Sequence, residues 1–277
     1  MPLVSMKQLL DLAEREDRAV GAFSVGNMEM VYGAVEAAES MDTPIILQIA
    51  EKRLSCSPFA LMAPMMISAA KHSKVDIAVH LDHGITLPMV REALNYGFTS
   101  VMLDASLRPF EENVAMTKQV VALAKEFGAT VEAELGVVGG NEGNGDHRSL
   151  CTEPDDAERF AAETGIDALA VAIGNAHGHY PTLPALRFDV LEEINSRLSI
   201  PLVLHGGTGI TPEMFRKAIH RGVRKINIAT ANFDALAAAA KEYCSGVSEA
   251  DYFILTKQMR GGIYENVRYY ISIFNNR

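Results

Sequence analysis

Residues 76–97, DIAVHLDHGITLPMVREALNYG, contain one complete strand–helix unit. The run DIAVHLD is rich in Val, Ile, Leu and Ala, which is typical of a strand buried on both faces of a parallel sheet. The segment LPMVREALNYG has helical periodicity and ends at Gly97, a residue type that favours the left-handed conformation at a helix C terminus. The stretch therefore predicts one β/α unit, with Asp82 and His83 where its strand leaves the core.

The same alternation of apolar runs and helical segments recurs along the chain, with no Pro-, Gly- or Ser-rich linker between halves. This pattern predicts an α/β protein, a (β/α)8 TIM barrel, whose usual length is roughly 250 residues. We expect a single TIM-barrel domain over 1–277, with the barrel at about 19–245. A C-terminal helical extension is expected at about 251–277, as one or two helices interrupted at Gly261-Gly262. The expected strands lie near 19–25, 44–49, 76–82, 99–104, 129–134, 167–173, 200–205 and 223–229.

The composition limits the classes of partner and location. Of 277 residues, 48% are hydrophobic and 22% are charged, which supplies a large core and argues against disorder. The net charge of −10 disfavours nucleic acid and anionic membrane as partners, so we expect a small-molecule ligand and a homo-oligomer, a dimer or tetramer. No apolar stretch approaches the roughly 20 residues of a membrane span, and the N-terminal stretch lacks the apolar core of a signal peptide. The three widely separated cysteines predict no disulfide, and together these features predict a cytoplasmic protein.

Three histidines each close a short apolar run: His83 follows DIAVHLD, His177 follows ALAVAIGNA and His205 follows IPLVL. Catalytic residues of a barrel lie just beyond the carboxyl ends of its strands, so the three imidazoles are expected at one mouth, where they could share a divalent metal. Three neutral imidazoles leave an open position on zinc, as a catalytic site requires, although the spacing does not exclude iron, cobalt or manganese. Any one of them alone would be interpreted as a core or loop histidine. His80 is expected in the core or behind the metal site, and His179 is expected to be exposed or to support the site.

Acidic side chains follow the same strands. Asp82 could move a proton while the adjacent His83 binds the metal, and the plain alternative for Asp82 is a turn cap. Asp104 and Glu134 could bind or orient the metal, or only accept hydrogen bonds near it. Glu142 lies at the centre of a long glycine-rich segment, GVVGGNEGNGDHRSLCTE. Such a segment is either a lid that delivers an acid or base on closure or a merely flexible connection.

Two short segments after the last two strands have the composition of an anion site. They are Gly206-Gly207-Thr208-Gly209 and Asn227-Ile228-Ala229-Thr230. Their backbone amides, and the N terminus of the helix expected after the second segment, could hold a phosphate where barrel enzymes often do. One glycine-rich turn more often serves backbone geometry than a ligand, but two such segments on consecutive strands favour a phosphate site.

Six motifs occur in the order HLDHG, SVMLDAS, VEAELGVVGG, VAIGNAHGHY, LVLHGGTG and KINIAT. With them the sequence closely resembles the class II, metal-dependent fructose- and tagatose-bisphosphate aldolases, from about Ala19 to Thr230. The resemblance implies reversible aldol cleavage of a ketose phosphate or ketose bisphosphate to dihydroxyacetone phosphate and an aldehyde. It also implies one catalytic zinc, with a second metal or a monovalent cation as a further option.

The resemblance also implies roles for single residues. The implied zinc ligands are His83, His177 and His205. Asp82 corresponds to the proton donor to the aldehyde oxygen, and Glu142 to the lid residue that removes a proton in some members. Asp104 and Glu134 correspond to acidic positions of the metal site or beside it. The positions that correspond to the dihydroxyacetone-phosphate site are Gly178, Gly206, Gly207, Thr208, Asn227, Ala229 and Thr230.

The chain departs from the family's pattern at Ser24, where Asn is frequent, and at Ala231, where an acid is usual. It also carries Glu51-Lys52-Arg53 after the second strand, where bisphosphate aldolases tend to have small residues. These differences leave the metal and phosphate residues intact, but they leave the aldehyde open. Arg53 either binds an anionic group on that aldehyde or is a solvated charge at the rim.

Three alternatives stand beside this interpretation. A Schiff-base aldolase would use a reactive lysine, for which Lys225 is the only candidate near a rim strand, although it enters that strand from the opposite end. A metal-dependent hydrolase would recruit His80 beside His83 to the metal. A regulator built on an inactive barrel would bind metal or sugar phosphate without needing a proton carrier at Asp82.

Overall fold

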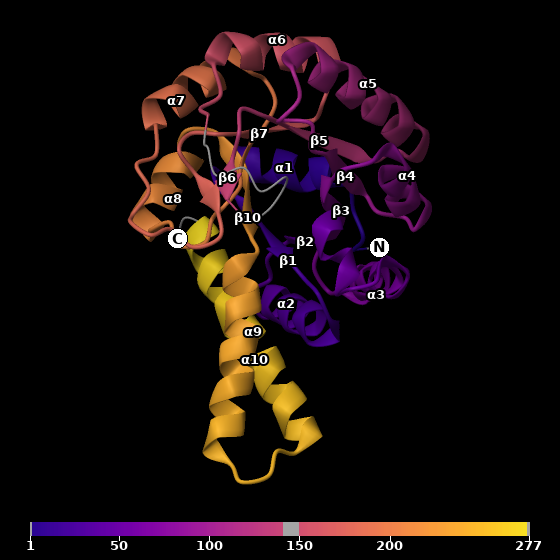
Figure 1. Cartoon of the computed structure of the whole chain (residues 1–277), viewed down its shortest axis with the longest axis vertical. Helices are drawn as coiled ribbons and strands as arrows, with labels where there is room; N and C mark the ends of the chain where they lie inside the picture. The colour runs from indigo at the N-terminus through magenta and orange to yellow at the C-terminus, as the bar shows by residue number, and fades with distance from the viewer. Residues whose placement is uncertain (1, 141–149, 276–277) are drawn as a thin grey trace.

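The computed structural model describes residues 2–140 and 150–275. Within these residues, eight parallel strands close a barrel in the order β1-β10-β9-β7-β5-β4-β3-β2, which confirms the predicted (β/α)8 fold (Figure 1). All eight lie at the predicted positions, because strands buried on both faces leave near-continuous apolar runs in the sequence. The barrel strands are β1 (Val20–Ser24), β2 (Ile45–Ala50), β3 (Ile77–Gly84), β4 (Ser100–Leu103), β5 (Thr130–Leu135), β7 (Ala168–Val171), β9 (Leu202–Leu204) and β10 (Val223–Ile228).

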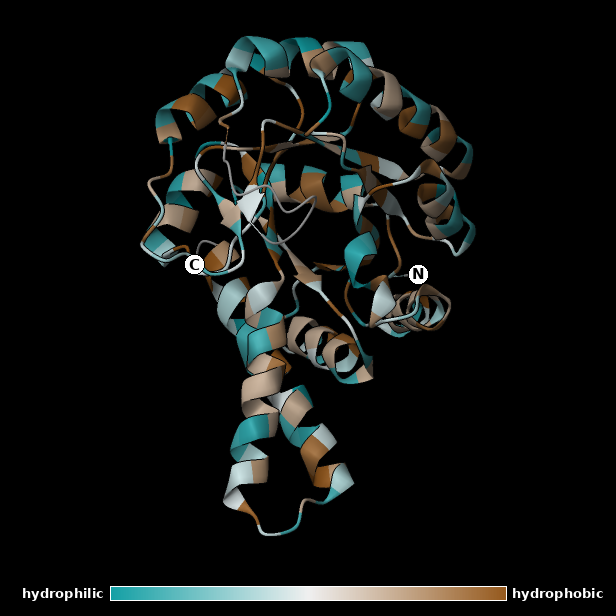
Figure 2. Ribbon diagram, in the orientation of Figure 1, coloured by the Kyte–Doolittle hydropathy of each residue, from teal (hydrophilic) through white to brown (hydrophobic). Residues whose placement is uncertain are grey.

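Helices surround the barrel and turn their apolar faces toward the strands, so hydrophobic and hydrophilic residues alternate along each ribbon (Figure 2). Several end at glycines in the left-handed conformation, as the sequence predicts; Gly128 and Gly165 have φ values of 66° and 69°. The helices are α1 (Met6–Arg15), α2 (Met28–Ser40), η1 (Glu51–Ser55, a 3-10 turn), α3 (Phe59–His72), α4 (Leu87–Asn95), α5 (Phe110–Phe127), α6 (Pro154–Thr164), α7 (Phe188–Arg197), α8 (Pro212–Ile219), α9 (Thr230–Gly246) and α10 (Tyr252–Phe274).

Helix α1 closes the amino-terminal end of the barrel. A capping box between Ser5 and Gln8 starts the helix, satisfying two backbone amides that a helix N terminus otherwise leaves without partners. Its apolar face packs onto side chains that point into the barrel from the beginnings of several strands, among them Val20 and Ala78. Helix α1 and these side chains therefore fill the amino-terminal end of the barrel interior, which leaves the carboxyl-terminal mouth as the open end.

Helices α9 and α10 form an antiparallel arm that projects from the barrel (Figure 1). The expected interruption at Gly261-Gly262 is wrong, because α10 runs unbroken through both glycines. A Cβ atom on Gly262 would lie 2.8 Å from the backbone oxygen of Ala235, so this glycine lets α10 pack closely on α9. The close packing at Gly262 offsets the roughly 1 kcal/mol by which a glycine disfavours a helix interior. No helix among the described residues is both long and apolar enough to cross a bilayer.

Candidate active site

A β-bulge places Asp82 and His83 at the mouth. Between Leu81 and Gly84, strand β3 advances three residues while the paired part of β4 advances two, so β3 carries one extra residue. His83 adopts a φ of +41°, a left-handed conformation that a side chain with a Cβ rarely takes. In a regular strand neighbouring side chains point to opposite faces. The bulge removes that constraint, and both side chains are buried at the barrel mouth.

His177 is held by a short strand pair that the sequence analysis did not predict. Strand β6 (Gly139–Gly140) pairs in parallel with β8 (Ala176–His177) above the barrel. A Cβ on Gly140 would lie 2.1 Å from the His177 backbone oxygen, and Gly140 has a φ of +108°. Only glycine fits this position, and its small size lets β6 approach the strand that carries His177.

His205 follows β9 and is fixed from its backbone. Its carbonyl oxygen accepts a hydrogen bond from Asn175 Nδ2 at 3.0 Å. The next residue, Gly206, has a φ of +67°, and a Cβ there would lie 2.1 Å from the Ala176 oxygen. Tyr180 completes the contact, because its hydroxyl accepts from Ala176 N and donates to Gly206 O, both at 2.9 Å. The backbones that carry His177 and His205 are thus locked together.

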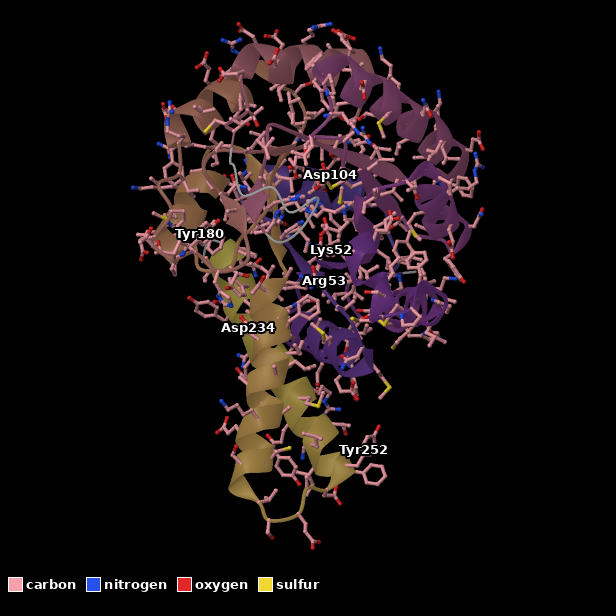
Figure 3. The ribbon with its side chains drawn as sticks, in the orientation of Figure 1. Lys52, Arg53, Asp104, Tyr180, Asp234 and Tyr252 are labelled. Atoms are coloured by element: carbon pink, nitrogen blue, oxygen red, sulfur yellow. The ribbon has the colours of Figure 1, made fainter. Side chains whose placement is uncertain are left out.

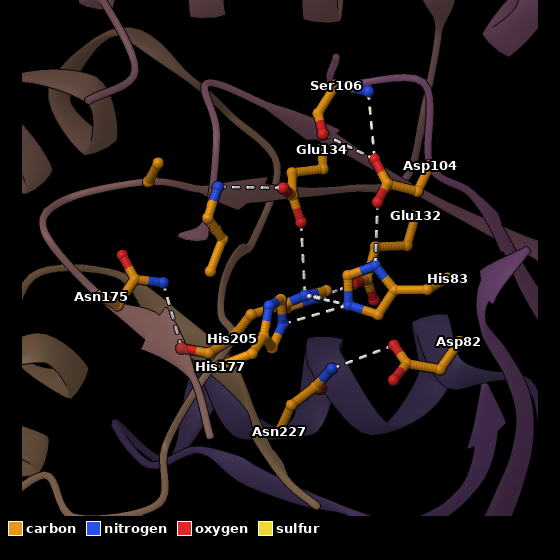
Figure 4. A network of polar contacts seen from close by, with 12 residues as sticks. Asp82, His83, Asp104, Ser106, Glu132, Glu134, Asn175, His177, His205 and Asn227 are labelled. Atoms are coloured by element: carbon orange, nitrogen blue, oxygen red, sulfur yellow. Dashed lines mark hydrogen bonds and ion pairs between the residues drawn. The ribbon is translucent and has the colours of Figure 1, made fainter. Parts of the chain in front are cut away.

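The three imidazoles converge as the sequence predicts (Figure 4). The Nε2 atom of His83 lies 3.2 Å from His177 Nε2 and 3.0 Å from His205 Nδ1. Zinc–nitrogen bonds of 2.0–2.1 Å in tetrahedral geometry separate the nitrogens by about 3.3 Å. Both distances from His83 Nε2 therefore match those between ligands of one metal ion, the three histidines offer ligand atoms within 4.8 Å of one another, and the donor set of imidazoles fits such a metal.

Carboxylates behind the rings assign which nitrogen faces the centre. His83 Nδ1 contacts Asp104 Oδ2 at 3.1 Å, and His205 Nε2 contacts Glu132 Oε1 at 2.8 Å. With a metal bound, each ring would keep its proton on these nitrogens and would turn the lone pairs of His83 Nε2 and His205 Nδ1 to the centre. Ser106 donates from both its amide and its hydroxyl to Asp104, which holds that carboxylate in place.

Burial and nearby charges give the groups distinct protonation behaviour. Burial disfavours the charged form of His83, but Asp82 and Asp104 outweigh it and raise the pKa of His83 to about 10. Burial lowers the pKa of His205 well below its ordinary value, so this ring is neutral, the form that binds metal. Burial, together with the charge of Asp104, raises the pKa of Glu134 to about 8. Glu134 Oε2 lies 3.4 Å from His205 Nδ1, at the edge of the same cluster.

Asp82 is fully buried and held by two amide groups. Asn227 Nδ2 donates to its Oδ1 at 3.0 Å, and Gln48 Nε2 donates to its Oδ2 at 3.1 Å. These contacts orient the carboxylate next to the imidazole cluster rather than toward a turn, so the plain alternative of a turn cap does not describe its surroundings. A carboxyl group fixed in this way can exchange a proton with a molecule bound at the mouth.

The predicted phosphate-binding residues also lie at this mouth. Thr208 Oγ1 accepts a hydrogen bond from the amide of Ala231, which joins the loop after β9 to the start of α9. A cavity of about 440 Å³ opens beside that helix start. Arg53 and Lys52 come from η1 and lie close to the mouth in Figure 3, and the guanidinium of Arg53 lies 5.2 Å from the centre of the Phe233 ring. The residues that line the cavity are Lys52, Arg53, Gly178, His179, Thr230 and Phe233.

Other predicted positions have different outcomes. Glu142 lies outside the described residues. His80 is fully buried and hydrogen-bonded to Ser100 at 2.5 Å, away from the three-imidazole cluster. His179 is largely exposed and pairs with Asp234 at 3.0 Å. Both histidines are therefore where the sequence analysis expects them, and neither joins the three-imidazole centre.

The sequence analysis missed several residues that hold this site. The sequence analysis gives no role to Glu132 and considers Lys225 only as a nucleophile. Both are fully buried, and Lys225 Nζ lies 2.9 Å from Glu132 Oε2. A charged residue within the buried strand VRKINI is the signal that could have indicated Lys225, since lysine is almost never fully buried unless it is paired. Gln48 gives a weaker signal of the same kind in IILQIA.

Comparisons with known proteins agree with the geometry. The sequence profile described as fructose-bisphosphate aldolase class-II matches residues 4–277. The fructose-bisphosphate aldolase of Staphylococcus aureus is 42% identical over 253 residues, covering 90% of this chain and 88% of that protein. The fructose-bisphosphate aldolase of Geobacillus stearothermophilus is 43% identical over 255 residues, covering 87% and 86%. The crystal structure of the YdjI aldolase from Escherichia coli K12 superposes with a TM-score of 0.88 at 33% identity, covering 98% of this chain and 97% of that one. The chain therefore belongs to the class II fructose-bisphosphate aldolase family, whose members depend on a metal, and it is an aldolase, a carbon–carbon lyase.

Proposed function

We propose that this aldolase reversibly cleaves a ketose phosphate or ketose bisphosphate into dihydroxyacetone phosphate and an aldehyde. The observation that carries the proposal is the convergence of three imidazole nitrogens beside Asp82, a carboxylate fixed by two amides. The curated relatives in Staphylococcus and Geobacillus are named for fructose bisphosphate, whereas the YdjI structure is named only as an aldolase. The aldehyde therefore stays open in this proposal.

The proposed metal is zinc, held by His83 Nε2, His177 Nε2 and His205 Nδ1. A zinc ion with three protein ligands supplies positive charge at an open coordination position, where it polarises a ketone oxygen and stabilises the negative charge that develops as the carbon–carbon bond breaks. The distances of 3.2 and 3.0 Å from His83 Nε2 to the other two nitrogens support the assignment. Asp104 and Glu134 form a second group with His83 whose ligand atoms lie within 4.8 Å of one another. A second metal or monovalent cation is proposed on the two carboxylates, because both nitrogens of His83 already have partners.

Asp82 is proposed to carry the proton at the aldehyde oxygen. In cleavage it accepts the proton of the substrate hydroxyl that becomes the aldehyde, and in condensation it returns that proton. The amide donors Asn227 and Gln48 keep the carboxylate turned toward the mouth. Glu142 stays a prediction as the group that moves the proton at carbon.

The substrate phosphate is proposed to bind at the loops after β8, β9 and β10. Support comes from Gly178 and Thr230, which line one cavity at the start of α9, where amides favour an anion. Lys52 and Arg53 line the same cavity and add positive charge to it. Glu51 anchors their turn, because its Oε2 accepts a hydrogen bond from Ile85 N at 2.5 Å, two residues after His83. The proposed phosphate residues are Gly178, Gly206, Gly207, Thr208, Asn227, Ala229 and Thr230.

Homo-oligomeric assembly and cytoplasmic location stay predictions. The arm of α9 and α10 supports assembly, because Tyr252 and Phe253 at its tip are 65% and 78% exposed (Figure 3). Exposed aromatic side chains of this kind are enriched at protein interfaces.

Removing the metal tests the proposal. Chelation should abolish cleavage, and added zinc should restore it; full activity of the stripped protein would refute the mechanism.

A screen of aldehydes with dihydroxyacetone phosphate, with product structures determined, identifies the aldehyde substrate. Substrate-dependent inactivation by borohydride would favour a Schiff base, although Lys225 is buried in an ion pair. Hydrolysis without carbon–carbon cleavage would favour a hydrolase, and binding of dihydroxyacetone phosphate without exchange of its carbon-bound proton would favour a regulator.

A further inference from the structure

Lys225 occupies a branch point inside the barrel. The side chain is fully buried in β10, and its Nζ contacts two groups, Glu132 Oε2 at 2.9 Å and Asn227 Oδ1 at 2.7 Å. Glu132 leads to the metal centre, because its other oxygen contacts His205 Nε2 at 2.8 Å. Asn227 leads to the proton carrier, because its Nδ2 donates to Asp82 at 3.0 Å (Figure 4). The Lys225 ammonium is thus connected to His205 through Glu132 and to Asp82 through Asn227, with one intervening side chain in each case.

Stability alone does not account for this arrangement. Taking an ammonium and a carboxylate out of water costs several kcal/mol each, and apolar side chains of similar volume often replace such a pair without loss of stability. The same strand carries apolar residues at Ile226 and Ile228, which pack in the core. A buried Lys225–Glu132 pair at this level of the barrel is therefore better explained by what it orients.

The ammonium determines how the Asn227 amide is turned. An amide has one acceptor end and one donor end, and a lysine ammonium can only donate. Because Lys225 donates to Asn227 Oδ1, the NH₂ end faces Asp82 and donates to its carboxylate. Without the ammonium the Oδ1 end of the amide loses its donor, so only the hydrogen bond to Asp82 would hold the amide in its orientation.

On the other branch, Lys225 fixes how the Glu132 carboxylate is turned. Lys225 binds Glu132 Oε2, and this leaves Oε1 to accept the proton of His205 Nε2. A ring that carries its proton on Nε2 presents the Nδ1 lone pair to the centre shared with His83. The lysine therefore supports both the tautomer of a proposed metal ligand and the orientation of a proposed proton carrier.

We propose that Lys225 is a positioning residue of the aldol reaction, which aligns His205 through Glu132 and Asp82 through Asn227. The proposal rests on the roles assigned above to His205 and Asp82. It gives the lysine a task that requires a fixed donor rather than a nucleophile. It also implies that the group of His80, Asp82 and Glu132, which lie close enough together to suggest a cation site, needs no metal, because the ammonium already pairs with Glu132.

The test compares Lys225→Met with the charge-balanced double variant Lys225→Met/Glu132→Gln. The measurements are the thermal midpoint, the zinc affinity of stripped protein in competition with a chromophoric chelator, kcat and KM for cleavage, and hydrogen exchange of dihydroxyacetone phosphate in D₂O. Arg224→Met is the matched control, because Arg224 is a largely buried cation of the same strand that pairs with Glu14 on α1 instead of the site. The control should change stability but leave zinc affinity, kcat and exchange within about threefold of native.

For Lys225→Met we expect zinc affinity to fall about 10- to 100-fold, as is usual for groups that orient a metal ligand. We expect kcat to fall at least about 100-fold, with hydrogen exchange reduced less, because Asp82 acts at the aldehyde oxygen rather than at the carbon of dihydroxyacetone phosphate. The double variant should regain the thermal midpoint, since no unpaired charge is left buried, but kcat should stay at least about 30-fold below native.

Two results would overturn the inference. One is a Lys225→Met enzyme with native zinc affinity and kcat. The other is a double variant whose kcat returns to within about threefold of native, because Lys225 would then serve only to neutralise Glu132. If the native protein cleaves no ketose phosphate, the proposed function is wrong. The zinc affinities of the same variants then still test whether Lys225 aligns His205 through Glu132.

Discussion

Replacement of Gly206 by alanine should disturb the metal centre without touching a metal ligand. The added Cβ would lie 2.1 Å from the Ala176 oxygen, whereas a carbon–oxygen contact needs about 3.3 Å, so the two backbones must separate by about 1 Å. Ala176 precedes His177 and Gly206 follows His205, so the separation moves two proposed ligands apart. Their ligand nitrogens lie only 3.2 and 3.0 Å from His83 Nε2. A misplacement of about 1 Å in an active site costs about 100-fold in rate. We therefore expect kcat/KM to fall about 100-fold and zinc affinity to weaken with it.

A matched variant separates this effect from backbone strain. Gly128 has nearly the same φ as Gly206, 66° against 67°, but a Cβ there meets nothing within 4 Å. Gly128→Ala should therefore cost the same roughly 1–2 kcal/mol of left-handed strain and leave the site unchanged. Urea unfolding measures the strain in both variants, and chelator competition measures zinc affinity without any phosphate present. Native zinc affinity and turnover in Gly206→Ala would show that the close approach of these backbones does not hold the ligands.

Four further predictions concern the proton carrier, the metal ligand His83 and the substrate. Asp82→Ala should keep zinc affinity within about threefold of native and lower kcat about 100- to 10,000-fold. A zinc titration and a cleavage assay measure the two quantities. A kcat above a tenth of native would exclude Asp82 as the proton carrier. In stripped protein the pKa of His83 is raised to about 10, so zinc must displace the proton of this ring. Apparent zinc affinity should therefore rise about tenfold per pH unit from pH 7 to 9. A zinc affinity that does not change with pH contradicts this prediction. The same raised pKa stabilises the folded stripped protein below about pH 6.5, and this contribution should be lost toward pH 10 in urea unfolding. Arg53→Met should raise KM more for aldehydes that carry a phosphate or carboxylate than for neutral ones, and equal effects would indicate a solvated charge.

The barrel could be predicted because its information is local. A strand buried on both faces must be apolar at nearly every position, and the helix ends carry their own glycine signals, so each β/α unit can be recognised within about 20 residues. The course of α10 could not be predicted in this way. Whether Gly262 breaks the helix depends on how closely α9 approaches it, and that distance is set by residues more than 20 positions away.

The convergence of the three histidines could be predicted for a related reason, but the elements that support them could not. Histidines at the ends of parallel strands must share one mouth, so their meeting follows from topology alone. Strand β6 could not be predicted, because two glycines have no strand propensity and pair only where β8 is already present. The bulge that turns both Asp82 and His83 to the mouth likewise depends on the pairing of β3 with β4.

The buried polar side chains beneath the three-imidazole centre could be predicted in part. Strand register makes Gln48, His80 and Ser100 direct neighbours on β2, β3 and β4, so their common level in the barrel follows once the barrel is recognised. Register also accounts for Lys225 and Asn227 facing the same side, since they are two residues apart on β10. It does not say which donor meets which acceptor, because the closing of the barrel brings β10 and β5 within reach of each other across the interior. The pairing of Lys225 with Glu132 is therefore a property of the closed barrel, and a lysine within the barrel strand VRKINI is the sequence signal that such a partner must exist.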